Sequence, residues 1–492
     1  MLLLGIDLGT SSIKVSVVDA DTGHVVAQAQ YPEQETGIKV VQPGWAEQSP
    51  EEWWQNVQGA IRKAVTSNSF NAQDISAIGI AYQMHGLVTV DKTGRSLRDA
   101  IIWCDGRAIP YGDKAFQAIG PERSLSRLLN SPGNFTAAKL AWVKDAEPEV
   151  FKQVDKVMLP GDYIALKLTG KATTSASALS EGIFWDFQDE QISADVLNYF
   201  GYDAAIIPEV QPVFSEHGQV SAAVAAQLGL RAGIPVSYKA GDQPNNALSL
   251  NVLQPGEVAA TAGTSGVIYG VSDELTYDQQ SRINSFAHVN HSAANKRVGV
   301  LLCINGTGIL NRWLRDTVAP GVSYAQLNEE ASKVAAGSNG LFILPFGNGA
   351  ERMLGNKMVG AHIHCLDLNI HTRAHLVRAG QEGIAFAFRY GLDIMRENGM
   401  HPSVIRAGKA NMFLSPLFTE AFVNVTGVPV ELYPCDGSVG AALGAGIGAG
   451  IYQNENDAFR NIKPLELIAP GAQQERYEEL YQQWKKLLLQ HL

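Results

Sequence analysis

The chain lacks the segments that would place it in or across a membrane. Its amino terminus carries no basic stretch and soon meets a charged residue, Asp7, which is not the pattern of a secretory signal. The longest apolar run, at 439–451, is rich in glycine and alanine and is too short to span a bilayer. We therefore expect a cytoplasmic protein without a membrane partner.

Cysteine is scarce, and negative charge outweighs positive charge. The four cysteines form no CxxC pair and have no zinc-ligand spacing, which predicts buried free thiols in a reducing compartment. The net charge of −11 argues against a nucleic-acid or anionic-membrane partner. Hydrophobic residues make up 46% and charged residues 18%, which is typical of a globular chain. The length of 492 residues predicts two large domains.

Apolar periodicity predicts alternating strands and helices. Short apolar or alternating runs predict strands at 2–6, 13–18, 25–31 and 75–81, and helical spacing predicts helices at 51–67 and 473–492. This pattern indicates an α/β fold.

A Gly-Thr-Ser turn occurs twice, at 9–11 and at 263–265. The second copy lies between predicted strands at 257–261 and 267–271, as the first lies between its own two strands. The shift of 254 residues is close to half the chain length, which indicates a duplicated domain. We therefore predict two domains, 1–245 and 246–492.

The turn at 7–12 has the residues that a phosphate-binding loop needs, although the chain contains no GxxxxGK[ST] sequence. Gly9 permits close approach of the backbone, and Thr10 and Ser11 add hydroxyl donors. Asp7, at the end of the strand, is suited to hold Mg²⁺ directly or through water. An ordinary β-hairpin turn favours the same residues and stays open as an alternative. The second turn favours the phosphate loop, because two facing loops can hold phosphates from both sides.

A carboxylate lies next to the seam between the two halves. Residues 234–241 predict a strand that leads into Asp242. Because clefts between domains are common ligand sites, we expect this carboxylate to lie in a cleft. The alternative is a turn aspartate before Gln243 and Pro244.

Several motifs, in their order along the chain, resemble those of the FGGY carbohydrate kinases. They are GIDLGTS at 5–11, QMHG at 83–86, WCDGR at 103–107, KLAW at 139–142, LPGDY at 159–163, GDQ at 241–243, GTSG at 263–266, RAGQEG at 378–383 and a glycine- and alanine-rich helix after 436–437. The resemblance implies an actin/hexokinase/Hsp70-like, ribonuclease H-like fold of two duplicated domains around a central cleft. It also implies an ATP-dependent sugar kinase that uses Mg²⁺, with D-xylulose as the leading substrate. A homodimer is left open.

The resemblance implies roles for single residues. Asp242 would be the catalytic base, and Asp7 would lie near the metal. The implied sugar contacts are Met84, His85, Trp103, Asp105 and Gln243. The implied nucleotide contacts are Gly9, Thr10, Ser11, Gly263, Thr264, Gly308, Arg312, Gly408, Lys409 and Asn411. Two structural alternatives stay open: His85 as a loop histidine bonded within the protein, and Asp105 paired with Arg107 at a strand end.

The sequence departs from the family pattern at three places. Ala407-Gly408-Lys409 replaces a run of glycines, residues 174–177 lack the usual aspartate, and the segment 345–352 is one residue longer. These departures leave rivals to D-xylulose: gluconate or another pentulose or hexose. Rivals of another class are a non-catalytic sugar sensor and an actin-fold ATPase. The presence of Asp242 speaks against a sensor.

Overall fold

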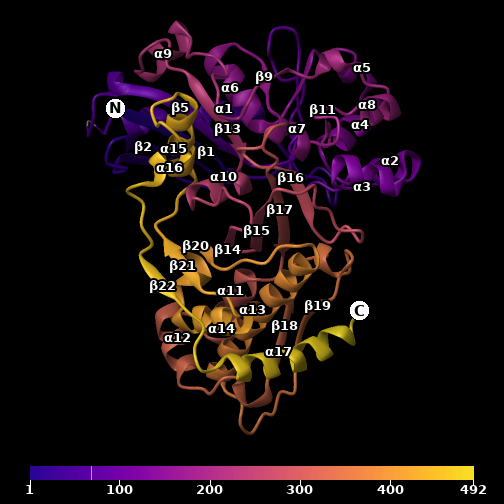
Figure 1. The fold of residues 1–492 in the computed structure, drawn as a ribbon, viewed down its shortest axis with the longest axis vertical. Coiled ribbons are helices and arrows are strands. Elements are labelled where there is room, and N and C mark those ends of the chain that lie inside the picture. The colour runs from indigo at the N-terminus through magenta and orange to yellow at the C-terminus, as the bar shows by residue number, and fades with distance from the viewer. Residues whose placement is uncertain (68) are drawn as a thin grey trace.

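Two mixed sheets carry the fold, one in each half of the chain (Figure 1). The computed structural model describes residues 1–67 and 69–492. The first sheet has the order β13-β5-β1-β2-β3, with β1 at Leu2–Leu8, β2 at Ile13–Asp19, β3 at Val25–Tyr31, β5 at Ile75–Tyr82 and β13 at Val236–Gly241. The second has the order β16-β17-β15-β14-β20-β21-β22, with β14 at Val258–Ala262, β15 at Gly266–Ser272, β16 at Asn284–Ala287, β17 at Val298–Ile304, β20 at Ile405–Gly408, β21 at Val430–Tyr433 and β22 at Glu466–Ile468.

Both sheets contain the same five-stranded pattern. In the first, β1 pairs antiparallel with β2 and β2 with β3, while β1, β5 and β13 run parallel. In the second, β14, β15 and β17 form the antiparallel part, and β14, β20 and β21 run parallel. The two Gly-Thr-Ser turns join β1 to β2 and β14 to β15, so they occupy equivalent positions. The predicted duplication and the two-domain α/β class are confirmed.

Helices and small sheets surround the two main sheets. The helices are α1 (Pro50–Val65), α2 (Ile109–Ile119), α3 (Pro121–Leu128), α4 (Thr136–Ala146), α5 (Pro148–Phe151), α6 (Pro160–Thr169), α7 (Ala176–Glu181), α8 (Ala194–Phe200), α9 (Ala222–Leu228), α10 (Asp242–Ser249), α11 (Gly308–Val318), α12 (Tyr324–Ser332), α13 (Arg373–Glu397), α14 (Pro416–Thr426), α15 (Gly437–Gly448), α16 (Glu455–Phe459) and α17 (Gln474–Leu489). Single turns of 3₁₀ helix occur at Ala72–Asp74, Ala204–Ile206, Ser338–Gly340, Arg352–Leu354 and Asn411–Leu414. Paired short strands are β4 (Glu47–Gln48) with β7 (Ala100–Ile101), β6 (Val88–Val90) with β8 (Lys156–Met158), β9 (Thr173–Thr174) with β12 (Glu209–Val210), β10 (Trp185–Asp186) with β11 (Gln191–Ile192), and β18 (Phe342–Phe346) with β19 (Gly360–His364).

Local sequence signals place the early elements correctly. The predicted strands and helix before residue 83 are confirmed, with ends that shift by one or two residues. The first helix begins at Pro50 because Ser49 precedes it and accepts a hydrogen bond from the N–H of Glu52. β1 is apolar on both faces because helices cover the sheet on both sides.

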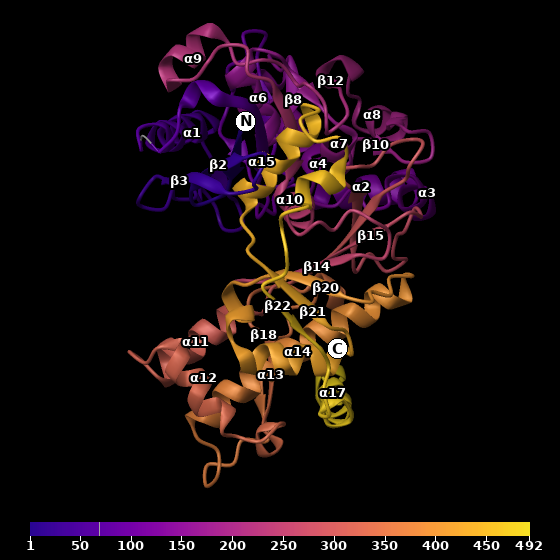
Figure 2. The same cartoon turned by 60° about the vertical axis from the view of Figure 1, so that its left-hand side comes forward.

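Helix α15 belongs to the second half of the sequence but packs on the first sheet. Figures 1 and 2 both show this late, yellow helix beside the indigo strands of the amino-terminal part. It lies so close that a Cβ at Gly5 would overlap the carbonyl oxygen of Ser438, and one at Gly79 would overlap that of Ala441. Helix α10 in turn contacts strands of both sheets and packs against α15. The boundary predicted between 245 and 246 falls inside α10, and it remains a prediction.

Two expectations from composition concern cysteine and membranes. All four cysteines are free thiols, as predicted, but the expectation that they are buried is wrong: Cys104 and Cys365 are exposed, and Cys303 and Cys435 are half-buried. Within residues 1–67 and 69–492, no helix has both the length and the apolarity to cross a bilayer.

Candidate active site

Three parallel strands of the first sheet end at one edge, and each is followed by a predicted site residue. Asp7 lies near the end of β1, the loop with Met84 and His85 follows β5, and Asp242 follows β13. Because the carboxyl ends of parallel strands meet at one edge, these side chains converge there. The sequence therefore positions them through strand order and not through proximity along the chain.

A cavity of about 410 Å³ opens in front of this edge. From the first half of the chain it is lined by Met84, His85, Trp103, Asp242 and Gln243. From the second half it is lined by Thr264, Ser265, Val267, Leu301, Cys303, Asn305 and Asn348. It lies between the two halves, and it brings the proposed base together with every predicted sugar contact except Asp105. We call it the inter-domain cavity.

A second cavity, of about 360 Å³, lies in the carboxy-terminal half. Its lining includes the predicted nucleotide contacts Gly263, Thr264, Gly308, Arg312 and Asn411. The remaining lining residues are Ala262, Asn311, Tyr324, Asn328, Met412, Leu414 and Ser415. Thr264 also lines the inter-domain cavity, so the two cavities meet at the second Gly-Thr-Ser turn.

The second Gly-Thr-Ser turn is locked to the start of α11. The N–H of Gly308 donates to the carbonyl oxygen of Gly263 over 2.9 Å, and the N–H of Ile309 donates to that of Thr264 over 3.1 Å. The hydroxyl of Thr307 donates to the same two carbonyl oxygens. A side chain at Gly308 would collide with the turn, so glycine permits this approach. The turn and the helix amino terminus therefore form one rigid wall.

The carboxylates of Asp7 and Asp242 have raised pKa values, so they hold protons more tightly than usual. Burial, together with the negative charge of Asp7, raises the pKa of Asp242 to about 7. Burial also raises the pKa of Asp7 to about 6, with Asp436 adding to the shift and Lys14 opposing it. Asp7 lies against the first turn of α15, where a Cβ at Gly437 would collide with its carboxylate. A cation placed between the carboxylates would relieve their repulsion.

His85 is held as a neutral acceptor. Its Nδ1 lies 3.0 Å from the carbonyl oxygen of Glu181, and because a carbonyl only accepts, Nδ1 carries the hydrogen. Burial lowers the pKa of His85 to about 3, and the nearby Lys139 charge lowers it further. The remaining nitrogen, Nε2, therefore has a free lone pair. The residue adopts φ 61°, and Lys139 Nζ holds its carbonyl oxygen at 2.9 Å.

Trp103 connects the cavity to the first Gly-Thr-Ser turn. Its Nε1 donates to the hydroxyl of Thr10 over 3.0 Å, and its side chain remains 51% exposed. Among the described residues, Gly9, Thr10 and Ser11 do not line either cavity themselves. The first turn therefore lies beside the inter-domain cavity, and the hydrogen bond from Trp103 to Thr10 links it to the cavity lining.

Asp105 was predicted to contact the sugar, but it does not line the inter-domain cavity. Its side chain is fully buried, and Oδ2 accepts from the N–H of Ala46 over 2.6 Å. It forms an ion pair with Arg107 at 2.7 Å, and the N–H of Arg107 donates to Oδ1. Because these bonds occupy both oxygens, Asp105 fixes the strand end and does not line the inter-domain cavity. The alternative stated from the sequence, a structural pair with Arg107, describes the structure.

Lys409 does not line the second cavity but a further cavity of about 490 Å³, which shares Leu414 with the second cavity, and its nucleotide role stays a prediction. Its Nζ forms an ion pair with Glu466 on β22 at 2.9 Å. Neither Gly408 nor Lys409 lines the second cavity, and a Cβ at Gly408 would come within 2.9 Å of Cys435. The backbone turns after β20, so Asn411 reaches the cavity while Lys409 points to the neighbouring strand.

Sequence reasoning missed Glu181, whose side chain lies next to Gly241, the residue before Asp242. Its side chain is buried, and the hydroxyl of Tyr82 donates to Oε1 over 2.6 Å. Oε2 has no hydrogen-bond partner and would lie 3.2 Å from a Cβ at Gly241, the residue before Asp242. Burial raises the pKa of Glu181 well above its usual value, and the charge of Asp242 raises it further. No motif surrounds this glutamate, so only its place in the fold shows its role.

A second glutamate, Glu351, stabilises the turn that leads into α11 by hydrogen bonds to its backbone. Glu351 is fully buried, and it accepts from the backbone N–H groups of Asn305 and Gly306, each at 3.0 Å. It comes from the segment 345–352, which departs from the family pattern and which also supplies Asn348 to the inter-domain cavity. The longer segment therefore supports the site directly.

Comparisons with known proteins agree on one family. The model for the FGGY family of carbohydrate kinases, N-terminal domain, matches residues 2–249, and the C-terminal domain model matches residues 258–451. A xylulose kinase of Bacillus subtilis is 30% identical, with 99% of this chain and 96% of the relative covered. A xylulose kinase of Escherichia coli is 29% identical, with coverage of 99% and 100%. The crystal structure of xylulose kinase from Rhodospirillum rubrum aligns with a TM-score of 0.88 at 28% identity, covering 100% of this chain and 99% of that one.

Replacing Glu181 with glutamine is expected to change how stability depends on pH. The folded protein keeps a proton on Glu181 that the unfolded chain releases above about pH 4.5. Stability is therefore lost as pH rises from that value toward the raised pKa of the folded state. Glu181→Gln cannot ionise, so it should unfold at a higher temperature than the wild type at pH 8, and the difference should vanish near pH 4.5. Calorimetry across this range measures both.

Tyr82→Phe is the control for this effect. It removes the hydroxyl that contacts Glu181 but keeps the ionisable group, so the pH dependence should persist. A Glu181→Gln variant whose unfolding temperature follows the wild type in parallel at every pH would mean that Glu181 is ionised in the folded protein.

Proposed function

The chain belongs to the FGGY family of carbohydrate kinases, and on that premise we propose that it transfers the γ-phosphoryl group of ATP to D-xylulose, forming D-xylulose 5-phosphate. Relatives that match almost the whole chain are xylulose kinases, which supports this substrate. A kinase that uses ATP and a free sugar would work in the cytoplasm, where both are present.

The observation that carries the proposal is the meeting of the two cavities at Thr264. A nucleotide in the second cavity, with its phosphates directed to Thr264, would present its terminal phosphate to the inter-domain cavity. A sugar in the inter-domain cavity would lie beside Asp242. Phosphoryl transfer depends mainly on positioning and charge, and this arrangement supplies the positioning.

Asp242 is proposed as the base that accepts the proton of the attacking hydroxyl. It lines the cavity, and its raised pKa of about 7 lets it both hold and release a proton near neutral pH. At the first turn of α10 it also lies near free backbone N–H groups, which stabilise its ionised form. Burial keeps Glu181 neutral, so it adds no negative charge to those of Asp7 and Asp242.

The proposed sugar contacts are Met84, His85, Trp103 and Gln243. His85 Nε2 can accept a hydrogen bond from a sugar hydroxyl, because its lone pair is free. The Oε1 atom of Gln243 is buried without a hydrogen-bond partner, so it too can accept from a hydroxyl. Met84 and the indole of Trp103 offer apolar surface to the carbon skeleton. Asp105 is left out of this set.

The proposed nucleotide contacts are those that line the second cavity and the two Gly-Thr-Ser turns. On the second cavity these are Gly263, Thr264, Gly308, Arg312 and Asn411. Gly9, Thr10 and Ser11 lie beside the inter-domain cavity and would approach the terminal phosphate from the opposite side. Domain closure would complete this contact and exclude water from the transferred group.

The carboxylates at the cleft fit a magnesium ion. Asp7 and Asp242 are half-buried, make the local potential more negative, and form no ion pair with lysine or arginine among residues 1–67 and 69–492. Asp7 would hold the ion directly or through water, and Mg²⁺ supplies charge neutralisation to the phosphate oxygens. The protein itself orients the hydroxyl and accepts its proton.

Release of ADP over a panel of sugars tests the proposed activity. D-xylulose should raise ADP release far above the rate with ATP alone, because the sugar completes the closed cleft. Gluconate and other ketoses at the same concentration measure the rival substrates. Gluconate turning over faster than D-xylulose would reassign the substrate, and sugar-independent hydrolysis at the same rate would indicate an ATPase. No hydrolysis or transfer at all would indicate a sensor.

Asp242→Asn should lower kcat by about 10²–10⁴, because it removes the proton acceptor while keeping the size of the side chain. Binding of the sugar should change little. In the wild type, kcat/KM should fall as pH drops below about 7, since Asp242 must be ionised to accept the proton. Steady-state kinetics between pH 5.5 and 9, in roughly half-unit steps, record both effects.

Asp7→Asn serves as the control, and it should instead shift the dependence on Mg²⁺ concentration. A folded Asp242→Asn enzyme that keeps more than about a tenth of the wild-type kcat would exclude Asp242 as the base. Among the described carboxylates near the site, Glu181 would then be the next to test.

His85→Ala should impair the use of the sugar and spare the use of ATP. The sugar hydroxyl would lose its partner at Nε2, which costs about 1–3 kcal/mol or roughly 5–150-fold in kcat/KM for the sugar. His24→Ala, at an exposed histidine, is the matched control and should be neutral. An unchanged KM for the sugar together with a raised KM for ATP would place His85 in the nucleotide subsite.

A further inference from the structure

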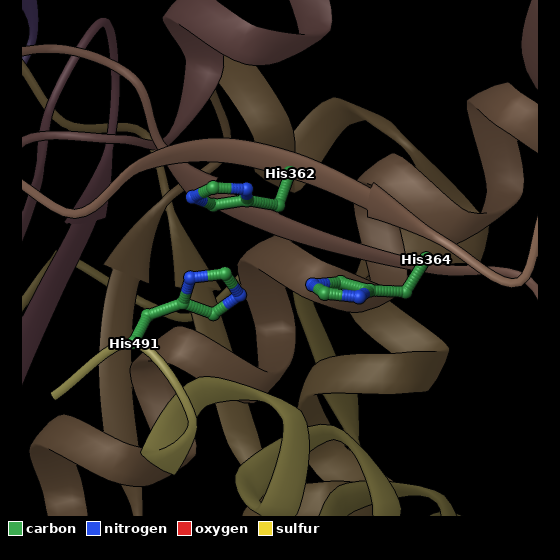
Figure 3. Close-up of side chains that lie close together, drawn as sticks. All are labelled: His362, His364 and His491. Atoms are coloured by element: carbon green, nitrogen blue, oxygen red, sulfur yellow. The ribbon is translucent and has the colours of Figure 1, made fainter.

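Three histidines gather outside both cavities. His362 and His364 lie two residues apart on β19, so both face the same side of the β18–β19 hairpin. His491 follows α17 and turns back toward them (Figure 3). One ligand atom from each of the three lies within 4.8 Å of those of the other two. None of the three lines the inter-domain cavity or the second cavity.

The packing of α17 brings His491 to this place. Trp484 is fully buried on α17, and its Nε1 donates to the carbonyl oxygen of Ile343 on β18 over 2.9 Å. The N–H of His491 continues the helix by donating to the carbonyl oxygen of Leu488. The rings of His491 and His362 stack with their centroids 4.0 Å apart. The cluster therefore rests on a fixed helix and a paired strand.

Each histidine of the cluster has a ring nitrogen whose lone pair is free to bind a metal ion. Nε2 of His362 lies 2.8 Å from the carbonyl oxygen of Val359, so it carries the hydrogen and leaves Nδ1 free. Nε2 of His364 and Nε2 of His491 are buried without any hydrogen-bond partner. Buried polar atoms are rarely left unpaired, so these two nitrogens point to a missing ligand.

We propose that His362, His364 and His491 bind one divalent transition-metal ion, with Zn²⁺ as the principal candidate, and that this ion fastens residue 491 to the β18–β19 hairpin. Imidazole nitrogen suits Zn²⁺, Ni²⁺ and Cu²⁺, whereas Mg²⁺ prefers oxygen ligands. Three protein ligands leave a fourth position for water. Tetrahedral zinc with bonds near 2.1 Å holds its nitrogens about 3.4 Å apart, so small rotations of the rings complete the site.

The site is separate from the magnesium site proposed for catalysis. It lies on the hairpin whose connecting segment carries Asn348 and Glu351, but its three ligands touch neither cavity. Binding of the ion can therefore be measured without ATP or sugar. A failure of the kinase proposal would leave this inference standing, and the reverse is also true.

The test uses the full chain without a polyhistidine tag, after treatment with a chelator and desalting. Titration with Zn²⁺ against a chromophoric competitor should show one equivalent bound with a Kd below about 10 µM. The temperature of unfolding should rise by at least about 2 °C with excess Zn²⁺, because the ion binds only the folded arrangement. Mg²⁺ at the same concentration should compete poorly.

Single variants decide which residues bind. His362→Ala, His364→Ala and His491→Ala should each weaken Zn²⁺ binding at least about tenfold and remove the thermal shift. His364→Gln gives a second variant in case alanine disturbs packing. The matched control is His371→Ala with His375→Ala, a pair whose rings lie 5.4 Å apart on the same half of the chain. This control should still bind one equivalent of Zn²⁺ and show the same rise in unfolding temperature.

Three outcomes would overturn the proposal. The first is no binding tighter than about 10 µM in the wild type. The second is equal binding in the wild type and in folded variants at 362, 364 and 491. The third is loss of the bound equivalent in the control pair alone.

Discussion

The parallel alignment of β1, β5 and β13 is the constraint on which the site depends. Each strand is bonded to its neighbour in register, so their ends cannot move apart without breaking the sheet. Asp7 and Asp242 are thereby held in a region where burial and like charge oppose their ionisation. The sheet maintains this unfavourable arrangement. A bound cation, or a proton taken up from a donor, would relieve the repulsion between the two carboxylates.

The second half repeats the same frame but uses it differently. Its hairpin turn is anchored to α11 by backbone hydrogen bonds, and the corresponding strand edge carries small residues and amides around the second cavity. One duplicated pattern therefore provides acidic chemistry on one side, and amides, small residues and the guanidinium of Arg312 on the other. Thr264 is the point where the two sets of groups meet.

Local sequence patterns predicted the strands, the duplicated turn and the residues at strand ends, because these depend on short-range periodicity and strand order. The direction of single side chains was less predictable. Asp105 and Lys409 each lie close in sequence to a site residue, yet each pairs with a charged partner, Arg107 or Glu466, and neither lines the inter-domain cavity or the second cavity. Glu181 had no motif at all, since its position behind Asp242 arises only when α7 packs against the sheet. Long-range packing decided all three.

The crossing of α15 has a consequence for how the chain is made. The face of the first sheet that carries Gly5 and Gly79 is shaped to receive this helix, which ends at Gly448. During synthesis the first sheet is complete at β13, yet this face stays bare while about 200 further residues leave the ribosome, roughly ten to forty seconds at usual elongation rates. The amino-terminal half therefore cannot finish folding on its own. Over that interval the face of the sheet that α15 will cover stays open to solvent.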